Sequence, residues 1–413
     1  MKEFRYDIVS NPEIFQENRL AAHSDHPYFK KKNAAYDDLS TFRFSLNGIW
    51  KFAYARNEAE SVKEFYQVDY DCNYWDNIRV PGHIQMQGYD KPQYVNTQYP
   101  WDGHELIEPG EIPTRFNPTA SYVKYFTVPE TMKNQPLYIS FQGVESGFAL
   151  WLNGEYIGYS EDSFTPSEFE LTPYLVEGEN KLSVKVFKWT AGSWCEDQDM
   201  FRFSGIFRDV YLFTIPEVHV WDMKIQTNLK NKDTAADLVI DMDATNSGNY
   251  QMELLGPDGD VVINGNGTLE KKNHVVIPVQ EPLLWSAEQP FLYELRISIF
   301  DARTEFQEVI VEKVGFRRFE MIDNIMHING KRIVFRGVNR HEFSSDHGRA
   351  LSVDDIRKDI ITMKQNNINA IRTSHYPNRT ELYRLCDEYG LYMIDETNRE
   401  TPGPWDVIME GTR

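Results

Sequence analysis

Cysteines are scarce in this sequence, and long apolar runs are absent. The 413 residues contain three cysteines, Cys72, Cys195 and Cys386, which lie too far apart in the sequence to form a disulfide framework or a metal cluster. A sparse and odd number of cysteines is typical of a reducing compartment. No run approaches the roughly 18 apolar residues of a membrane-spanning helix, and the first residues carry charges where a signal peptide has an apolar core. We therefore expect a cytoplasmic protein that spans no membrane.

Basic residues are also few. The 43 Lys and Arg residues stand against 63 Asp and Glu, which gives a net charge of −20. An acidic surface repels the phosphate backbone of nucleic acids and the headgroups of anionic lipids. Nucleic acid and membrane surfaces are therefore excluded as expected partners, whereas a neutral substrate fits this charge.

Aromatic residues are abundant by comparison, at 14% of the chain. Aromatic rings pack well on pleated surfaces, so this content favours a β-rich architecture. It also suits sugar binding, because the face of a ring can lie against the apolar C–H face of a pyranose. The chain is too long for one typical domain, and we expect two or three.

The first part of the sequence is expected to be an arm followed by an all-β domain. Residues 1–40 are polar and irregular, and we interpret them as an N-terminal arm. Within residues 41–216, apolar residues alternate along 181–188, and Asn153-Gly154 between two apolar stretches is a strong hairpin signal. Strands at short spacing with Gly and Pro turns predict a jelly-roll sandwich that could bind sugar.

A second β-rich block covers residues 217–322. Segments 238–242 and 293–300 alternate with a period of two, and Pro-Asp-Gly at 257–259 marks a turn. The length of the block is typical of an immunoglobulin-like β-sandwich. It contains no cysteine pair, which excludes the antibody type.

The pattern changes in residues 323–413. Three short apolar strands are predicted, at 333–338, 368–372 and 391–394. Between them lie two stretches of helical periodicity, of which the first starts at a capping box of Ser352 and Asp355 and the second ends at Gly390. This β-α-β-α-β order predicts parallel strands, but 413 − 322 = 91 residues are far fewer than the ~250 of a (β/α)8 barrel. The block is either the first β/α units of an incomplete (β/α)8 (TIM) barrel or a very small α/β domain.

A polar cluster follows each of these three strands. The clusters are Asn339–Glu342, Arg372–His375 and Asp395–Glu400. Because the carboxyl ends of parallel strands gather at one rim, three such clusters favour a functional site. Asp395 and Glu396 are adjacent and must point to opposite faces, so they cannot act together on one substrate. We expect ion-pair or hydrogen-bond roles for them.

The two histidines of this rim admit more than one interpretation. His341 and His375 end adjacent strands and could both contact a hydroxylated ligand. With Glu400 they also have the composition of a metal site, although the spacing matches no compact zinc motif. A histidine near a core is most often structural.

The acidic run 196–199 (Glu-Asp-Gln-Asp) is the candidate site of the first domain. Three carboxylates within four residues repel one another unless a cation compensates them. A metal ion held by oxygen ligands, or the nearby Arg202 and Arg208, would do so.

Six motifs, in order, resemble the family-2 glycoside hydrolases, and within them the large bacterial β-galactosidases. They are GHIQMQGYDKPQYVNTQYP (82–100), EDQDMFRFSGIFRDV (196–210), LLWSAEQPFLYEL (283–295), FRGVNRHE (335–342), MKQNNINAIRTSHYP (363–377) and LCDEYGLYMIDETN (385–398). The resemblance implies a jelly-roll sugar-binding domain, an immunoglobulin-like domain and a (β/α)8 barrel.

The resemblance also implies residue roles. It assigns galactose binding to Asn96, Asp199, His341, Arg372 and His375. It further implies that Asp199 is a sodium ligand and that Glu400 is a magnesium ligand. The family often has a histidine as a second magnesium ligand two residues after this glutamate, where this chain has Pro402, which cannot ligate through its side chain. The magnesium site is therefore implied less firmly than the sodium site.

The implied activity is hydrolysis of terminal non-reducing β-D-galactose residues, for instance in lactose, by a retaining double displacement in a homo-oligomeric full-length enzyme. The acid/base and the nucleophile of the family follow later barrel strands, so we expect no catalytic residue among these 413 and no activity of the isolated chain. The alternatives are a β-glucuronidase or β-mannosidase relative and a non-catalytic carbohydrate-binding protein.

Overall fold

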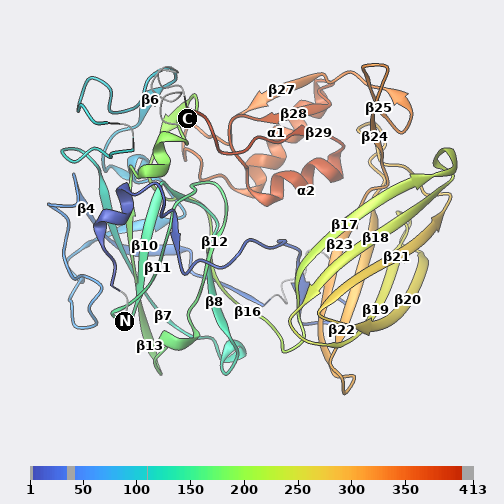
Figure 1. Ribbon diagram of the computed structural model, residues 1–413, viewed down its shortest axis with the longest axis horizontal. Coiled ribbons are helices and arrows are strands. Elements are labelled where there is room, and N and C mark those ends of the chain that lie inside the picture. Colours follow the sequence, from blue (N-terminus) through green and yellow to red (C-terminus); the bar gives the residue numbers. More distant parts are fainter. Residues whose placement is uncertain (1–2, 35–41, 109, 402–413) are drawn as a thin grey trace.

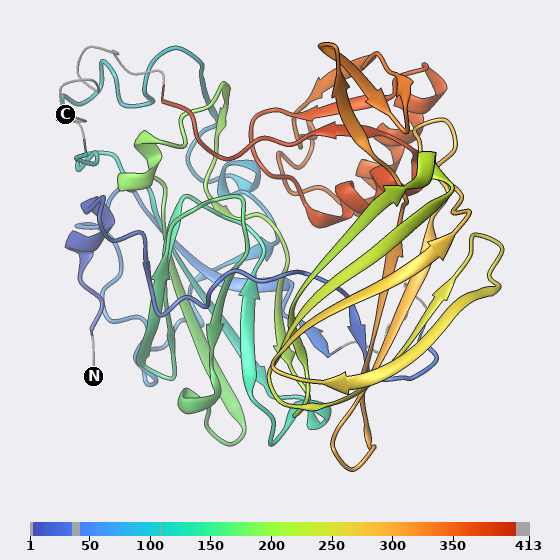
Figure 2. The ribbon, with the colours of Figure 1, turned by 45° about the vertical axis from the view of Figure 1, so that its right-hand side comes forward.

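The computed structural model describes residues 3–34, 42–108 and 110–401 (Figure 1). Two β-sandwiches and a small α/β unit follow one another along the chain. The α/β unit lies between the upper parts of the two sandwiches in Figure 1 and above the second sandwich in the view of Figure 2. No helix in these ranges has the length and apolar character needed to cross a membrane.

Two antiparallel sheets form the first sandwich. The larger has the order β1 (Gln16–Glu17), β11 (Glu155–Ser160), β10 (Gly147–Leu152), β13 (Glu179–Phe187), β7 (Thr119–Thr127), β4 (Gly48–Ala55), β5 (Asp76–Val80). The smaller has the order β12 (Ser167–Glu170), β8 (Leu137–Phe141), β16 (Val210–Thr214), β3 (Arg43–Ser45). Their inner faces share one core, in which Trp50, Leu150 and Val184 of the first sheet pack with Ile139 and Leu212 of the second.

Shorter elements complete this part. Two small ladders pair β6 (Gln93–Val95) with β14 (Met200–Arg202) and β9 (Val144–Glu145) with β15 (Gly205–Ile206). The short 3-10 helices are η1 (Tyr6–Ser10), η2 (Ile84–Gln87), η3 (Glu130–Met132), η4 (Thr172–Tyr174), η5 (Ala191–Trp194) and, in the second sandwich, η6 (Asn231–Asp233).

The predicted hairpin at Asn153-Gly154 is confirmed. It joins β10 to β11, and both residues have positive φ angles, 52° and 88°. A two-residue turn of this kind requires positive φ at both positions, which asparagine and glycine tolerate best.

The second sandwich consists of a three-stranded and a five-stranded sheet. The first is β17 (Val220–Lys230), β18 (Ala235–Ala244), β21 (Lys272–Gln280), and the second is β2 (Tyr28–Phe29), β23 (Phe306–Val314), β22 (Tyr293–Phe300), β19 (Gly248–Leu255), β20 (Val261–Leu269). β22 alternates strictly between buried and half-buried side chains, as its period of two predicts. Because β1 pairs in the first sandwich and β2 in the second, the N-terminal segment connects the two.

The α/β unit follows a small meander of β24 (Phe319–Ile322), β25 (Ile325–Ile328) and β26 (Lys331–Arg332). It consists of β27 (Gly337–Arg340), α1 (Val353–Gln365), β28 (Ala370–Thr373), α2 (Thr380–Tyr389) and β29 (Tyr392–Ile394), with all three strands parallel. The predicted β-α-β-α-β order is thus confirmed. Ser352 and Asp355 form the predicted capping box, and Gly390 ends α2 with φ 76°.

The first predicted strand of this unit was wrong in its position. We expected it at 333–338, whereas β27 covers Gly337–Arg340, and Val334 is exposed. The reason is that β27 can pair only where β28 runs beside it, and that ladder starts with Gly337 opposite Ala370. An apolar segment forms a strand of a sheet only where a neighbouring strand is available to pair with it.

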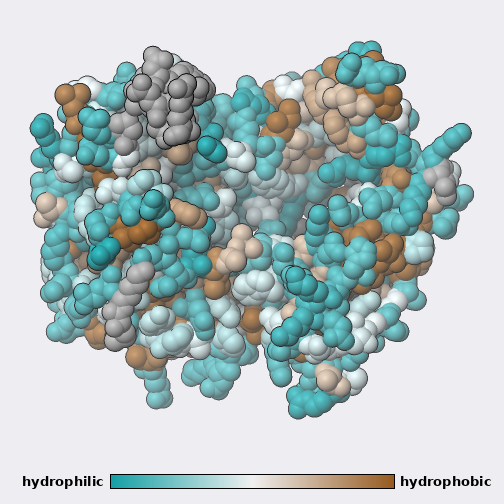
Figure 3. All heavy atoms as spheres, viewed as in Figure 1, coloured by the Kyte–Doolittle hydropathy of each residue, from teal (hydrophilic) through white to brown (hydrophobic). Residues whose placement is uncertain are grey.

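The surface is largely hydrophilic on the face shown in Figure 3, in keeping with the net charge. Apolar side chains gather over the β24–β25 hairpin at the upper right of that view, where Phe319, Met321, Ile322 and Ile325 are all exposed.

Candidate functional site

The ends of the parallel strands bring the two predicted histidines together. His341 directly follows β27, and His375 lies two residues after β28. Their ring centroids are 5.5 Å apart and the ring planes cross at 83°. Two imidazoles at this separation can contact neighbouring hydroxyl groups of one ligand.

Arg372 and Glu396 hold one of these rings in place. The Arg372 guanidinium is ion-paired with Glu396, and its Nη1 donates to Asn339 Oδ1 at 3.2 Å. The other oxygen of Glu396 lies 3.0 Å from His375 Nδ1. If the neutral ring carries its proton on Nδ1 for this contact, Nε2 remains as an acceptor.

The neighbouring carboxylate has different partners. Asp395 Oδ1 accepts from Thr373 Oγ1 at 3.1 Å and from Tyr383 Oη at 2.8 Å. Asp395 and Glu396 therefore engage separate groups, which confirms that these adjacent carboxylates have hydrogen-bond and ion-pair roles.

Asn96 and Asp199 come from the first sandwich. β6 and β14 form an antiparallel ladder in which Val95 opposes Met200; Asn96 directly follows β6, and Asp199 directly precedes β14. The Tyr94 phenol donates to Asp199 Oδ1. Asn96 is exposed and Asp199 is half-buried, so the ladder presents both to the surface.

Charged groups of both domains influence the pKa of His341. Burial lowers the pKa of His341, and the charges of His375 and Arg349 lower it further, while Asp199 opposes them. A depressed pKa keeps His341 neutral at neutral pH, so that its ring has one donor and one acceptor nitrogen for a hydroxylated ligand.

The acidic run contacts the segment after β29. The Glu400 amide donates to the Cys195 carbonyl at 2.7 Å, and the Asp197 amide donates to the Glu400 carbonyl at 3.1 Å. The carboxylate of Glu196 accepts from Asn398 Nδ2 at 2.6 Å. Glu400 is thus placed beside the acidic run by its backbone, and its side chain is exposed.

Arg202 is one cation that compensates this run. It is ion-paired with Asp197, and both side chains are buried. Burial nevertheless raises the pKa of Asp197 to about 7 and that of Glu196 to about 8. Arg208, the other candidate, pairs instead with Glu342, with 2.6 Å between Nη2 and Oε2.

Metal ligation at this site stays a prediction. Within residues 3–34, 42–108 and 110–401, no three His, Cys, Asp or Glu side chains are grouped closely enough to hold a metal ion together. A cation at Asp199 or Glu400 would need backbone carbonyls or water for its remaining ligands. Pro402, on which the expectation about the second magnesium ligand depends, lies outside the described residues.

Sequence reasoning missed Arg349 and a group of exposed rings. Arg349 is buried between the α/β unit and the first sandwich, where it pairs with Glu145 at 2.6 Å. Phe201 and Phe343 stack with centroids 5.3 Å apart and planes inclined by 12°. Each phenylalanine lies two residues after a predicted ligand-binding residue, which is a signal that the sequence does contain.

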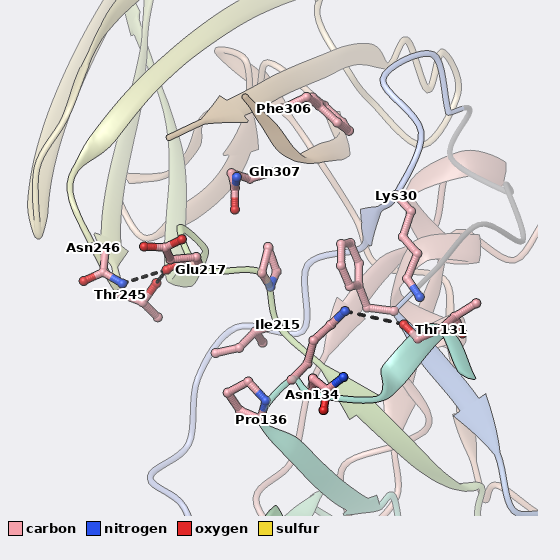
Figure 4. Close-up of a pocket in the computed structure, with 13 residues that line it drawn as sticks. Lys30, Thr131, Asn134, Pro136, Ile215, Glu217, Thr245, Asn246, Phe306 and Gln307 are labelled. Atoms are coloured by element: carbon pink, nitrogen blue, oxygen red, sulfur yellow. Dashed lines mark hydrogen bonds between the residues drawn. The ribbon is translucent and has the colours of Figure 1, made fainter. Parts of the chain in front are cut away.

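A separate cavity of about 870 Å³ lies between the two sandwiches (Figure 4). Lys30, Thr131, Ile215 and Phe306 are among its lining residues, and they come from the N-terminal segment and from both sandwiches. None of the predicted site residues lines it. We therefore assign it to the junction of the sandwiches and not to the candidate site.

Family models match nearly the whole chain in sequence order. The sugar binding domain of glycosyl hydrolases family 2 matches residues 43–216, a further family 2 domain matches 218–317, and the family 2 TIM barrel domain matches 319–412.

Similar proteins extend well beyond these residues. The chain is 55% identical over 401 residues to a β-galactosidase of Halalkalibacterium halodurans, which covers 96% of this chain and 40% of that protein. It is 48% identical to a β-galactosidase of Clostridium acetobutylicum (97% and 45%) and 42% identical to the β-galactosidase large subunit of Leuconostoc lactis (97% and 66%). The chain thus spans less than half the length of the first two relatives.

Solved structures share the fold. A β-glycosidase from Bacteroides vulgatus aligns with a TM-score of 0.70 at 24% identity, over 86% of this chain and 44% of that one. A β-glucuronidase from Bifidobacterium dentium aligns with a TM-score of 0.72 at 22% identity, over 86% and 61%. At these identities the likeness speaks for the architecture alone.

Proposed function

Since the chain belongs to glycosyl hydrolase family 2, we propose that the polypeptide containing it hydrolyses β-galactosides and that the residues described here bind the galactosyl group. In this proposal the first sandwich is the family's jelly-roll domain, and β27–β29 with α1 and α2 begin a (β/α)8 barrel. The observation that supports it most is that the His341 and His375 rings lie 5.5 Å apart, while Phe201, two residues after Asp199, stacks on Phe343, two residues after His341.

The chemistry of these groups suits a neutral sugar. The neutral imidazole of His341 can donate to and accept from hydroxyl groups, and the Asp199 carboxylate accepts from them. Arg372 fixes Glu396, which in turn fixes His375, so that ring is oriented before the ligand arrives. A carboxylate at Asp199 also disfavours a uronic acid in contact with it, because like charges repel.

Bond cleavage requires two more carboxyls. A retaining glycosidase places them about 5–5.5 Å apart on either side of the scissile bond. Glu396 and Asp395 are engaged by Arg372, His375, Thr373 and Tyr383. By the family resemblance the acid/base and nucleophile follow later strands. For these residues we therefore propose binding alone. For the whole protein we propose hydrolysis, lactose as a substrate, homo-oligomerisation and a cytoplasmic location.

The proposal also includes two cations. Asp199 would contribute one oxygen to a sodium ion and Glu400 one to a magnesium ion, and each ion would supply fixed positive charge beside the sugar. No step of the proposal depends on them.

The test is a titration of the 413-residue chain with galactose and with glucuronate by calorimetry. We expect galactose to bind, glucuronate to bind more weakly, and Asp199→Asn to weaken galactose about 10- to 100-fold, because a charged hydrogen-bond partner is lost. Equal or tighter binding of glucuronate would favour the β-glucuronidase alternative, and absence of any galactose binding would refute the proposal.

A further inference from the structure

Three aromatic side chains form an exposed strip beside the candidate site. Tyr94, Phe201 and Phe343 are 52%, 38% and 36% exposed. Phe201 stacks on Phe343 at 5.3 Å and meets Tyr94 edge to face at 5.4 Å. Single exposed apolar residues are common on protein surfaces, but three rings in contact form a patch that needs a reason.

The strip is built by strand geometry. Tyr94 of β6 and Phe201 of β14 are direct cross-strand partners. In β14, Met200 and Arg202 on either side of Phe201 are buried, so Phe201 lies on the outward face of the ladder. Asp199 lies directly before β14, and its carboxylate accepts a hydrogen bond from the Tyr94 phenol, so it adjoins the strip.

The strip is also anchored from below. Arg349 Nη1 donates to the Phe201 carbonyl at 2.9 Å, which fixes the backbone that carries the ring. The Arg349 guanidinium lies 5.1 Å from the centroid of Phe203, which is buried beneath Phe343 with 6.3 Å between their centroids. The rings are therefore presented by a rigid support, and little conformational freedom is lost when a ligand covers them.

The strip lies beside the proposed galactose-binding residues, and this position indicates which part of a ligand would cover it. The Tyr94 phenol donates to Asp199, and Phe343 follows His341 by two residues. Any galactoside held by Asp199 and His341 must direct the remainder of the molecule away from them. An aromatic face is the surface against which an apolar ring packs best.

We propose that Tyr94, Phe201 and Phe343 form a binding surface for the aglycone of a β-galactoside, with preference for an aromatic ring or the C–H face of a second sugar. The proposal rests on the galactose-binding function above and adds a determinant of substrate choice to it. Phe343 and Phe201 supply the stacking faces, while Tyr94 joins the strip to the galactosyl position through Asp199.

The experiment compares two thiogalactosides, which resist hydrolysis. The affinities of methyl and phenyl 1-thio-β-D-galactopyranoside for the 413-residue chain are measured by calorimetry, for the parent and for Phe343→Ala. We expect the phenyl compound to bind about 3- to 10-fold more tightly to the parent, the range expected for one aromatic contact. Phe343→Ala should abolish that advantage and leave the methyl affinity unchanged, which also shows that the variant is folded.

Two more variants make the result independent of one substitution. Phe343→Trp should keep or increase the phenyl advantage. Phe319→Ala removes a ring on the β24–β25 hairpin that is more exposed than Phe343, 53% against 36%, and should change neither affinity. If neither thiogalactoside binds the parent, the proposed function is wrong. If both bind but the phenyl advantage is absent, or persists in Phe343→Ala, the aglycone surface is wrong and the galactose site stands.

Discussion

Replacing Arg349 with methionine would remove the cation from a buried ion pair between the α/β unit and the first sandwich. Arg349 Nη2 lies 2.7 and 2.6 Å from the two oxygens of Glu145, and the side chains are 1% and 5% exposed. The same guanidinium donates to the Phe201 carbonyl. The variant would leave the Glu145 carboxylate buried without this partner.

The expected loss of stability follows from the two interactions that Arg349→Met removes. Breaking a buried pair costs about 3–5 kcal/mol, because the remaining charge keeps its desolvation penalty. The lost bond to Phe201 adds about 0.5–1.5 kcal/mol. We expect the contact between the α/β unit and the first sandwich to weaken by about 3.5–6.5 kcal/mol in total. Adding Glu145→Gln removes the uncompensated charge, so the double variant should be more stable than Arg349→Met alone.

The assay must report on this contact, since a chain of three parts need not unfold in one step. Hydrogen exchange of peptides covering 199–203 and 341–350 gives the local opening free energy. Lys188→Met is the matched control, because Lys188 and Asp90 form an equally buried pair of 2.6 Å inside the first sandwich. It should reduce protection near residue 188 and spare 341–350. A loss under about 1 kcal/mol in Arg349→Met, or a further loss on adding Glu145→Gln, would refute the reasoning.

Three further outcomes follow from single side chains. Burial raises the pKa of Glu196 to about 8, above its usual 4.5, so the contribution of this group to stability is fully present below about pH 4.5 and is lost as the pH rises through 8. The melting temperature should therefore fall from pH 5 to pH 9, and it should fall less in Glu196→Gln. Tyr94→Phe keeps the ring but removes the hydrogen bond to Asp199, so galactose affinity should drop about 3- to 10-fold in calorimetry, and an unchanged affinity would contradict that role. Met321→Lys places a charge in the exposed apolar hairpin and should shift any self-association seen by sedimentation to higher concentration, whereas an unchanged profile would exclude that surface.

Features fixed by neighbouring residues could be predicted from the sequence. The Asn153-Gly154 hairpin, the capping box of Ser352 and Asp355 and the end of α2 at Gly390 are each confirmed. In all three the side chain or the permitted φ angle acts within a few residues of its own position. The order of strands and helices in the α/β unit follows from the same local patterns.

Features that depend on partners far away in the sequence could not be predicted. The Glu145 partner of Arg349 is 204 residues away, and nothing around residue 349 marks it as buried. The shift of the first parallel strand from 333–338 to Gly337–Arg340 has the same cause, because the extent of β28 decides where pairing begins. The candidate histidines were found because strand ends of a parallel sheet converge by rule, whereas a buried ion pair obeys no such rule.

The strip beside the site shows why an aromatic surface is hard to recognise in a sequence. In Met200-Phe201-Arg202 the usual expectation places the phenylalanine inside and the arginine outside, yet Phe201 is exposed and Arg202 is buried. Arg202 can be buried because Asp197 pairs with it, and that pairing turns Phe201 to the surface. Local rules are expected to fail where a protein gives up packing for binding. The inversion at Phe201 is therefore an independent reason to test the aglycone surface there, because burying this ring in place of Arg202 would have been the more stable arrangement for a strand without a ligand.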